Sequence, residues 1–301
     1  MKEWCRYGGE VARALAHKTP VVAFETTVVT HGLPHPDGVT AALSLEQIVR
    51  EAGATPATIG IIGGAVRVGL TSAELEQLAT TPNVAKINLS NLAAALSSGL
   101  PGSTTVAVTM VAAQASGIRV FATGGIGGVH RDAAESGDIS SDLTALSRVP
   151  VAVVCAGAKA ILDLPRTVEM LETVGVPVFG FGTDEFPAFY RRSSGLPVDR
   201  RYDSIAELAA AVRLHLSLGL GTGVLIANPI PIADEMASDL YDRALQTALS
   251  EAETHRIRGR AVTPFLLDRI RAATGGDSVR ANVALLRHNA QVAAAVAVAG
   301  V

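Results

Sequence analysis

The stretch VPVAVVCAGAKAILDLPRTVEMLETVGVPVFGFG, residues 149–182, constrains the fold more than any other part of the chain. Residues 150–155 form a short apolar run of the kind that makes a buried strand. Apolar side chains then recur at positions 161, 164, 168 and 171, which is the spacing of one helix face. Gly175 ends that helix, and VPVFGFG begins another strand. A strand, helix and strand of this length predict two parallel strands in one sheet.

The same alternation extends along the whole chain. Helix-period stretches separate several of the short apolar runs, which lie at 21–24, 58–62, 84–89, 118–122, 150–155, 176–181 and 223–227. Only 4% of the residues are aromatic, a composition that suits close packing of helices on a sheet. No repeat or linker divides the sequence. These patterns predict an α/β fold with a single domain over residues 1–301.

Charge and cysteine usage exclude several classes of protein. The net charge of −3 gives no reason to expect nucleic acid or an anionic membrane as a partner. Cys5 and Cys155 are the only cysteines, so neither a disulfide framework nor a cysteine zinc site is supported. The N-terminus lacks the apolar region of a signal peptide, and the C-terminal apolar tail is too short to span a bilayer. We therefore expect a cytoplasmic protein.

One carboxylate interrupts an otherwise apolar strand. In PVVAFETTVV, residues 20–29, Glu25 is the only charged residue between Lys18 and Asp37. Burial of an unpaired carboxylate is costly, so its retention here indicates either a catalytic role or a structural ion pair.

Lysine is rare in this chain. Of 25 basic residues only four are lysine, and two of these, Lys86 and Lys159, lie inside apolar segments. Lysine can lose its proton and act as a nucleophile, whereas arginine stays protonated. We expect Lys159 in the first turn of a helix after a buried strand, where it is a candidate for Schiff-base chemistry. The alternatives are a lysine at a helix end that reaches solvent and a buried Glu–Lys pair.

The segment FATGGIGGVHRDAAESGDISSDL, residues 121–143, carries further polar groups after a predicted strand. Its glycines allow backbone N–H groups to approach an anion, and His130 and Arg131 suit a phosphate. Asp138 suits a hard divalent cation that keeps most of its waters. A tight turn followed by a solvated loop is the alternative. His31 and His35 lie in a proline- and glycine-rich turn, so a metal pair there is not favoured.

Taken together, these stretches resemble the pseudouridine-5′-phosphate glycosidase family over nearly the whole chain. The segments that carry the resemblance include VVAFETTVVTHGLPHPDG, VFATGGIGGVHR, DISSDL and VVCAGAKAILDLPRTVEMLETVGVPV. The resemblance implies an α/β/α sandwich around a mixed, largely parallel sheet, a homotrimer and a divalent metal, usually Mn²⁺. It also implies an enzyme that breaks or forms the C–C bond between C1 of ribose 5-phosphate and C5 of uracil.

The resemblance also implies roles for individual residues. The general acid/base falls on Glu25, the covalent lysine on Lys159, the second active-site lysine on Lys86, and the metal carboxylate on Asp138. Contacts to the sugar phosphate and to the base fall on Thr105, Val106, His130, Ser140, Ser141, Asp142 and Asn282. A carbon leaving group is poor, and an iminium on Lys159 would provide the electron sink that carboxylate pairs lack.

Three departures from the family pattern affect the expected acceptor. Residues 88–92 read NLSNL where the family usually has SRRDL, Gly38 replaces Asn, and His288 replaces the first Asn of an Asn-Asn pair. Because the other matched positions are intact, these changes are expected to lie outside the ribose phosphate site and to leave a less polar acceptor site. This reading favours a C-glycosynthase that joins ribose 5-phosphate to an aromatic polyketide acceptor, as in alnumycin-type biosynthesis. The alternatives are the glycosidase that releases uracil and, more distantly, a non-catalytic phosphosugar-binding protein.

Overall fold

The computed structural model describes residues 2–257 and 262–301. Across its main sheet the strands lie in the order β1 (Cys5–Tyr7), β4 (Ala65–Val68), β3 (Thr55–Ile62), β2 (Val21–Phe24), β7 (Val120–Ala122), β8 (Ala152–Cys155), β11 (Val224–Ala227), β9 (Val178–Phe181) and β10 (Arg200–Tyr202). β6 (Gly102–Thr104) pairs with β3, and β5 (Ala85–Ile87) pairs with β6. Among these described strands only the pairs of β3 with β4 and with β6 are antiparallel. The predicted mixed, largely parallel sheet is therefore confirmed.

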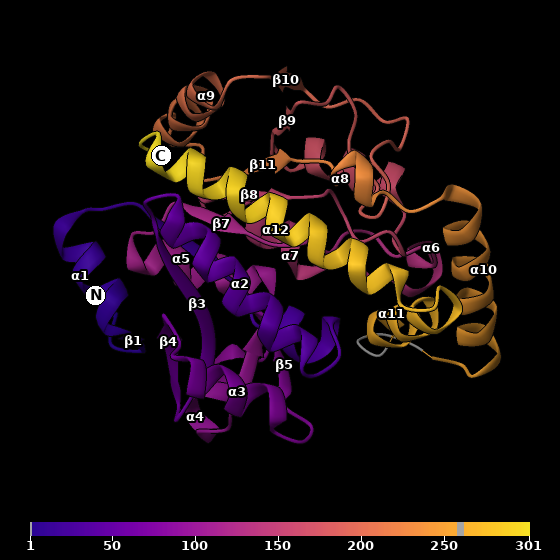
Figure 1. The fold of residues 1–301 in the computed structure, drawn as a ribbon, viewed down its shortest axis with the longest axis horizontal. Coiled ribbons are helices and arrows are strands. Elements are labelled where there is room, and N and C mark those ends of the chain that lie inside the picture. Colours follow the sequence, from indigo (N-terminus) through magenta and orange to yellow (C-terminus); the bar gives the residue numbers. More distant parts are fainter. Residues whose placement is uncertain (1, 258–261) are drawn as a thin grey trace.

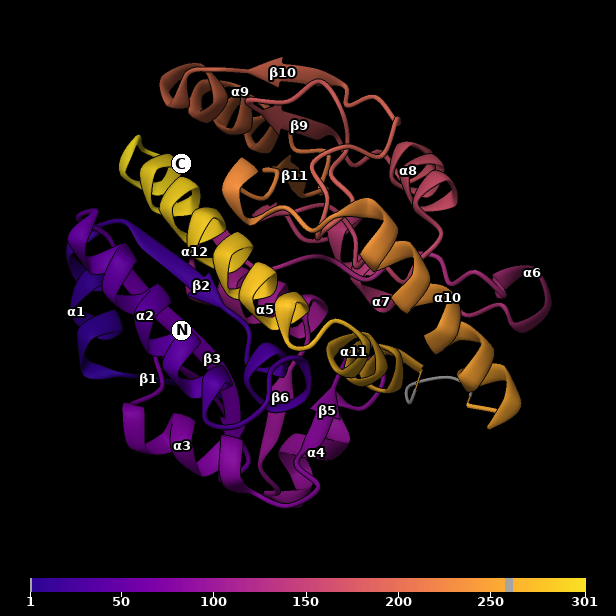
Figure 2. The same ribbon diagram turned by 45° about the vertical axis from the view of Figure 1, so that its right-hand side comes forward.

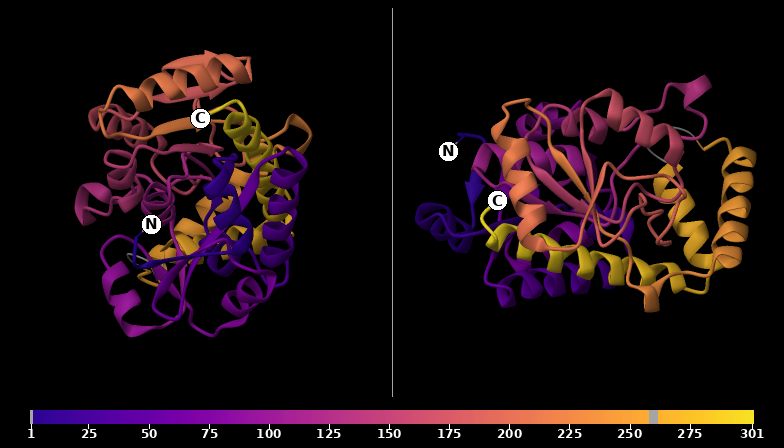
Figure 3. Two further views of the ribbon diagram at one scale, coloured as in Figure 1. Left: turned by 90° about the vertical axis from the view of Figure 1, so that its left-hand side faces the viewer. Right: turned by 90° about the horizontal axis from the view of Figure 1, so that it is seen from above.

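Helices cover both faces of this sheet (Figure 3). The longest, α12 (Asp277–Val298), crosses β2, β7 and β8 beside α2 (Asp37–Glu51), as Figure 1 shows. On the other face α5 (Val106–Ser116) packs against β2 and β7 and next to α7 (Ser141–Leu146). The C-terminal helix is half alanine and valine, and these small side chains allow it to lie close to the strands. These layers confirm the predicted fold class.

The remaining helices lie around these layers. The helices α1 (Gly9–His17), α3 (Ser72–Thr80) and α4 (Leu92–Ser98) lie beside the N-terminal strands, and α8 (Leu164–Thr173) and α9 (Ile205–Ser217) lie beside the C-terminal strands. The short α6 (Ala133–Ser136) lies near α10, at the opposite end of the molecule from α1. A π-helical turn, η1 (Val28–Gly32), follows β2, and a 3₁₀ turn covers Ile232–Asp234. At one end α10 (Ser238–Thr254) and α11 (Val262–Ala273) pack against each other (Figure 2). No helix within residues 2–257 and 262–301 is long and apolar enough to cross a membrane.

Parallel pairing brings the ends of the central strands together. β2 pairs with β7, and β7 pairs with β8, so Phe24, Ala122 and Cys155 all end their strands at the same edge of the sheet. Open α/β sheets bind ligands at this carboxyl edge. The residues that follow these strands are therefore the ones that define a candidate site.

The strand–helix–strand unit of residues 149–182 forms as predicted, with β8, α8 and β9 as its parts. The predicted position of Lys159 within it is wrong, because α8 begins only at Leu164 and is capped by the Asp163 side chain. Lys159 lies in the irregular segment before the helix, so the positive end of the helix dipole does not act on it. Pro165 stands at the start of α8, where its missing N–H costs no hydrogen bond.

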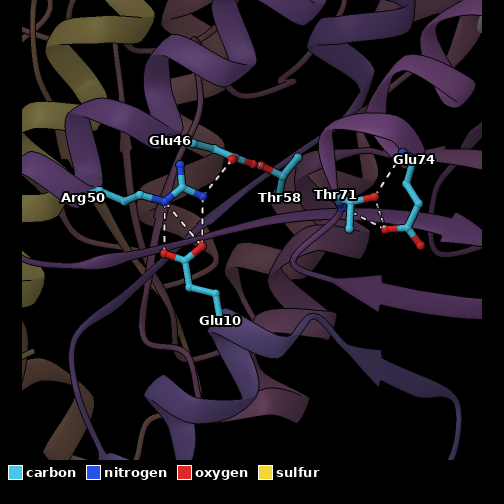
Figure 4. Close-up of polar contacts among 6 residues, drawn as sticks. All are labelled: Glu10, Glu46, Arg50, Thr58, Thr71 and Glu74. Atoms are coloured by element: carbon cyan, nitrogen blue, oxygen red, sulfur yellow. Dashed lines mark hydrogen bonds and ion pairs between the residues drawn. The ribbon is translucent and has the colours of Figure 1, made fainter.

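A second cluster of charged residues has a structural function (Figure 4). Arg50 on α2 donates to Glu10 on α1 with N–O distances of 3.0 and 2.9 Å, and it also contacts Glu46. Glu46 accepts a 2.6 Å hydrogen bond from the Thr58 hydroxyl on β3. This cluster joins two helices to the sheet, and these contacts satisfy the buried Glu46 carboxylate. Nearby, Thr71 and Glu74 form a capping box that begins α3.

Candidate active site

Glu25 follows β2 directly and is only 5% exposed. Its two carboxylate oxygens accept hydrogen bonds from the hydroxyls of Thr27 and Thr123. Thr123 follows β7, which lies next to β2, so the contact joins residues 98 positions apart in the sequence. Two hydroxyl donors fix the carboxylate and stabilise its charge in a buried position. Glu25 is therefore held at the sheet edge, and no arginine or lysine among the described residues is hydrogen-bonded to it.

Both lysines of the apolar segments reach the same place. Lys86 is on β5, and its pKa is lowered by burial and, secondarily, by the positive charge of Lys159. Glu25, Asp138 and Asp142 are close enough to oppose part of that shift. Glu25, Lys86 and Lys159 line both of the cavities described below. A carboxylate and two mutually repelling amines thus meet where a carbonyl carbon could be attacked.

The first of these cavities, called here the polar cavity, has a volume of about 1050 Å³. Its wall contains the start of α5, the glycine segment after β7 and the start of α7. Besides the three residues above, it is lined by Thr105, Val106, His130, Asp138, Ser140, Ser141 and Asp142. The hydroxyl of Thr105 is buried and has no hydrogen-bond partner among the described residues, so it is available to a ligand. The N-terminus of α5 and these hydroxyls form a site suited to a phosphate.

The Asp142 carboxylate is hydrogen-bonded to the backbone of two segments of this wall. One carboxylate oxygen accepts from the N–H of Ala107 in the first turn of α5 at 3.0 Å, and the other from the N–H of Gly127 at 2.8 Å. A β-carbon at Gly127 would lie only 2.2 Å from the Ser140 hydroxyl oxygen, so the glycine permits this close approach. Asp142 therefore joins two segments of the cavity wall, a role that its position in the sequence did not reveal.

Replacement of Asp142 by alanine is expected to lower the free energy of unfolding by about 2–4 kcal/mol, because two buried N–H groups lose their acceptor. Replacement by asparagine should cost less, since one oxygen remains. Chemical denaturation of both variants measures the difference, with Ser147→Ala on the same chain segment as a control. Equal stability of the alanine variant and the wild type would contradict the role assigned to Asp142.

Asp138 and His130 face each other across the polar cavity. The distance between His130 Nε2 and an Asp138 carboxylate oxygen is 3.9 Å, and Asp138 is one-third exposed. Within the described part of the chain no group of three or more His, Cys, Asp and Glu residues could hold a metal ion. The donor set therefore does not form a closed cage, and it fits only a hard cation that is held through one carboxylate and keeps its other ligands as water or substrate oxygens.

The second cavity, called here the apolar cavity, has a volume of about 480 Å³ and adjoins the polar one through the shared residues Glu25, Thr27, Lys86, Lys159 and Thr263. Val28, Phe189, Pro264 and Leu267 supply its apolar surface. Asn282 on α12 is 5% exposed, and its buried side-chain oxygen has no partner in the part of the chain that the structure describes. An apolar slot with a free amide oxygen suits a flat ring that carries an N–H or O–H group.

The expectation that residues 88–91 lie outside the sugar phosphate site is wrong. Asn88, Ser90 and Asn91 line the polar cavity together with Asp138 and Ser140, and they do not line the apolar cavity. The Asn91 side chain accepts from the Asn88 N–H at 2.8 Å and donates to the Lys86 carbonyl at 3.2 Å. The loop turns this way because β5 pairs with β6, next to the start of α5. The changed residues therefore alter the polar cavity and not the apolar cavity described above.

The other two departures lie apart from both cavities. His288 bonds the Pro229 carbonyl, and Asn289 donates to the Thr123 carbonyl at 2.8 Å and so fixes α12 at the end of β7. A β-carbon at Gly38 would lie 2.6 Å from the Val29 carbonyl oxygen, so the glycine packs against η1.

The structure thus brings the expected site residues to one edge of the sheet, in two adjoining cavities. Sequence reasoning missed Thr27, Thr123, His31 and Phe189, which also line the apolar cavity. The second threonine after Glu25 and the threonine before the glycine pair at 124 and 125 were the only signals for the two hydroxyls, and neither indicates a contact by itself.

Comparison with known proteins identifies the class. The model of the family described as indigoidine synthase A like protein matches residues 10–299. The chain belongs to this family. It is 52% identical over 289 residues to the pseudouridine-5′-phosphate glycosidase of Caldanaerobacter subterraneus subsp. tengcongensis, with 96% of this chain and 94% of the relative covered. The enzyme of the same name from Solibacter usitatus is 53% identical, with 96% of each chain covered.

Solved structures support the same fold. The prealnumycin C-glycosynthase AlnA in complex with ribulose 5-phosphate has a TM-score of 0.91 and 39% identity, with 99% of this chain and 97% of that chain covered. An indigoidine synthase A (IdgA)-like protein from Thermotoga maritima has a TM-score of 0.88 and 34% identity, with 98% and 95% covered. The resemblance to pseudouridine-5′-phosphate glycosidases seen in the sequence is therefore confirmed at the level of the family.

Proposed function

We propose that this protein hydrolyses the C–C glycosidic bond of pseudouridine 5′-phosphate to give uracil and ribose 5-phosphate. The observation that carries the proposal is the meeting of Glu25, Lys86 and Lys159 on the wall between a phosphate-suited cavity and an apolar slot with a free amide oxygen. The sugar phosphate would occupy the polar cavity and the base the apolar one. The reacting C1 carbon would then lie between them, next to both lysines.

The proposed steps assign a role to each group. Glu25 first takes a proton from the Lys159 ammonium, and the resulting amine attacks C1 while Glu25 passes that proton to the ring oxygen, so that the sugar ring opens. The nitrogen lone pair then expels the base as C5 gains a proton, which leaves an iminium between C1 and Lys159. Water adds to the iminium and releases ribose 5-phosphate, so one water is consumed per bond broken. Lys86, with its lowered pKa, can carry a proton between these steps.

We propose uracil and not an aromatic polyketide as the group attached to C1 of the sugar, for two reasons. The loop whose altered sequence favoured a different acceptor lines the polar cavity and leaves the acceptor side unchanged. Relatives that are named as glycosidases also share 52–53% of their residues with this chain, against 39% for the C-glycosynthase AlnA. The C-glycosynthase reaction on ribose 5-phosphate is the second candidate, supported by the TM-score of 0.91 to AlnA.

The test is incubation of the purified protein with pseudouridine 5′-phosphate and, separately, with ribose 5-phosphate plus uracil. Release of uracil at about 1–10³ s⁻¹, the range of ordinary enzymes, supports the proposal. No release, with ribose 5-phosphate still forming a borohydride-reducible adduct, favours the synthase. Binding of ribose 5-phosphate without any adduct favours the phosphosugar-binding protein.

We also propose that a divalent cation, Mn²⁺ by family resemblance, binds through Asp138 and neutralises charge on the substrate phosphate. Removal of the metal with EDTA should lower kcat/KM at least about tenfold, and added Mn²⁺ should restore it. In Asp138→Ala, neither treatment should change the remaining activity. A wild-type enzyme with full activity after exhaustive chelation would contradict this assignment. The homotrimer stays a prediction, which light scattering of the purified chain can check.

A further inference from the structure

His31 lies at the junction between the apolar cavity and a third cavity, called here the outer cavity, of about 740 Å³. The two cavities share five lining residues, His31, Gly32, Pro264, Leu267 and Asn282. His31 and Asn282 therefore both border the space assigned to the base. His31 belongs to η1, and π-helical turns occur often at functional sites.

Hydrogen bonds assign the tautomer of this histidine. The Thr30 hydroxyl oxygen lies 2.6 Å from Nδ1 of His31 and donates its single hydrogen to the Ser103 hydroxyl at 2.8 Å or to the Thr26 carbonyl at 3.3 Å. In that arrangement Nδ1 carries the N–H and donates it to Thr30. The lone pair of the neutral ring then lies on Nε2.

The surroundings keep the ring neutral. Burial lowers the pKa of His31, and the positive charge of Lys86 lowers it further. The hydrogen bonds found within the described residues use Nδ1 of this side chain and not Nε2. Nε2 is thus an acceptor that a ligand in the cavity can use.

We propose, building on the function proposed above, that His31 positions the base by accepting a hydrogen bond from one of its ring N–H groups. A uracil joined to the sugar through C5 has both N1–H and N3–H free, whereas a base joined through N1 has only one. The cavity wall offers two acceptors that lack a partner in the described protein, Nε2 of His31 and the side-chain oxygen of Asn282. Two acceptors for two N–H groups select a C-linked base by its hydrogen-bonding pattern.

The experiment compares wild type, His31→Ala and His31→Gln on pseudouridine 5′-phosphate and on its 1-methyl and 3-methyl derivatives. His31→Ala should lower kcat/KM for the parent substrate by about 10-fold to 100-fold, the effect of one buried hydrogen bond. Ribose 5-phosphate carries no base, so its borohydride-trapped adduct should form at a rate within about twofold of wild type. His31→Gln, which offers an oxygen acceptor, should recover part of the loss. His17→Ala, at an exposed histidine on α1, is the control.

The methylated substrates give the decisive comparison. For one of the two methylated substrates, kcat/KM should be much lower than for the parent in wild type. In His31→Ala the two values should be nearly equal, because the same hydrogen bond is already lost. The proposal would be overturned if methylation lowered kcat/KM by the same factor in His31→Ala as in wild type for both derivatives. It would also be overturned if His31→Ala lowered the rate of adduct formation as much as the rate of turnover. A wild-type protein that forms the adduct but never releases uracil contradicts the proposed function instead, and this inference with it.

Discussion

Lys159→Ala is expected to form no borohydride-reducible adduct with ribose 5-phosphate and to lose turnover by about 10⁴-fold or more, because the covalent step has no substitute. In wild type, intact-mass analysis should show one reduced sugar phosphate per chain, and peptide mapping should place it on Lys159. Lys159 and the glycine segment follow β8 and β7, which pair side by side, and Lys159 lines the polar cavity that the proposed function assigns to the sugar phosphate.

Two further variants make this experiment specific. Lys159→Arg keeps a positive charge but cannot form an iminium, so it should also lose the adduct while retaining affinity for the sugar phosphate. Lys86→Arg should still form an adduct on Lys159, because Lys86 is assigned a proton-transfer role. An adduct mapped to Lys86 would exchange the two roles, and full function of Lys159→Arg would favour a binding protein over an enzyme.

Glu25→Gln is expected to lower kcat by about 10²-fold to 10⁴-fold, the usual contribution of a general acid or base. The substitution preserves the size of the side chain; one of the Thr27 and Thr123 hydroxyls can still donate to the amide oxygen, and the other can turn to accept from the amide N–H, so the folded structure should persist. Substrate affinity should change much less than kcat, which steady-state kinetics can separate.

Glu46 provides a matched control for this variant. It is also a buried glutamate, 7% exposed, and it accepts a hydrogen bond from a threonine, but it lies between α2 and β3 and lines neither catalytic cavity. Glu46→Gln should lower the free energy of unfolding by about 1–3 kcal/mol and leave kcat unchanged. If both glutamine variants lost activity equally, Glu25 would have only a structural role.

These two glutamates show the limit of reasoning from residue types. In the sequence, Glu25 stands out because it is alone in an apolar strand, and a catalytic role or an ion pair both explain it. Glu46 raises no question, since it sits in a helix with charged neighbours. The structure shows that Glu46 has the arginine and threonine partners of a structural carboxylate, and that the partners of Glu25 within residues 2–257 and 262–301 are two hydroxyls at the wall of a cavity.

The loop at residues 88–91 shows a different limit. Its altered sequence is evident, but which side of the substrate it faces depends on the pairing of β5 with β6. No local pattern encodes this pairing, because it joins a short strand to a neighbour that itself branches from β3. The inference about the acceptor therefore changed once the loop was located in the polar cavity.

The sequence by itself determined the fold class, the approximate positions of seven of the eleven described strands, and the unusual status of Glu25, Lys86 and Lys159. Local periodicity and the cost of burying charge contain that information. Only the tertiary structure decided which residues complete the site. Thr123 reaches Glu25 because β7 lies beside β2, and Asn282 reaches the apolar cavity because α12 crosses those strands. Contacts between segments so distant in the chain arise from strand order and helix packing, which the spacing of residues along the sequence does not express.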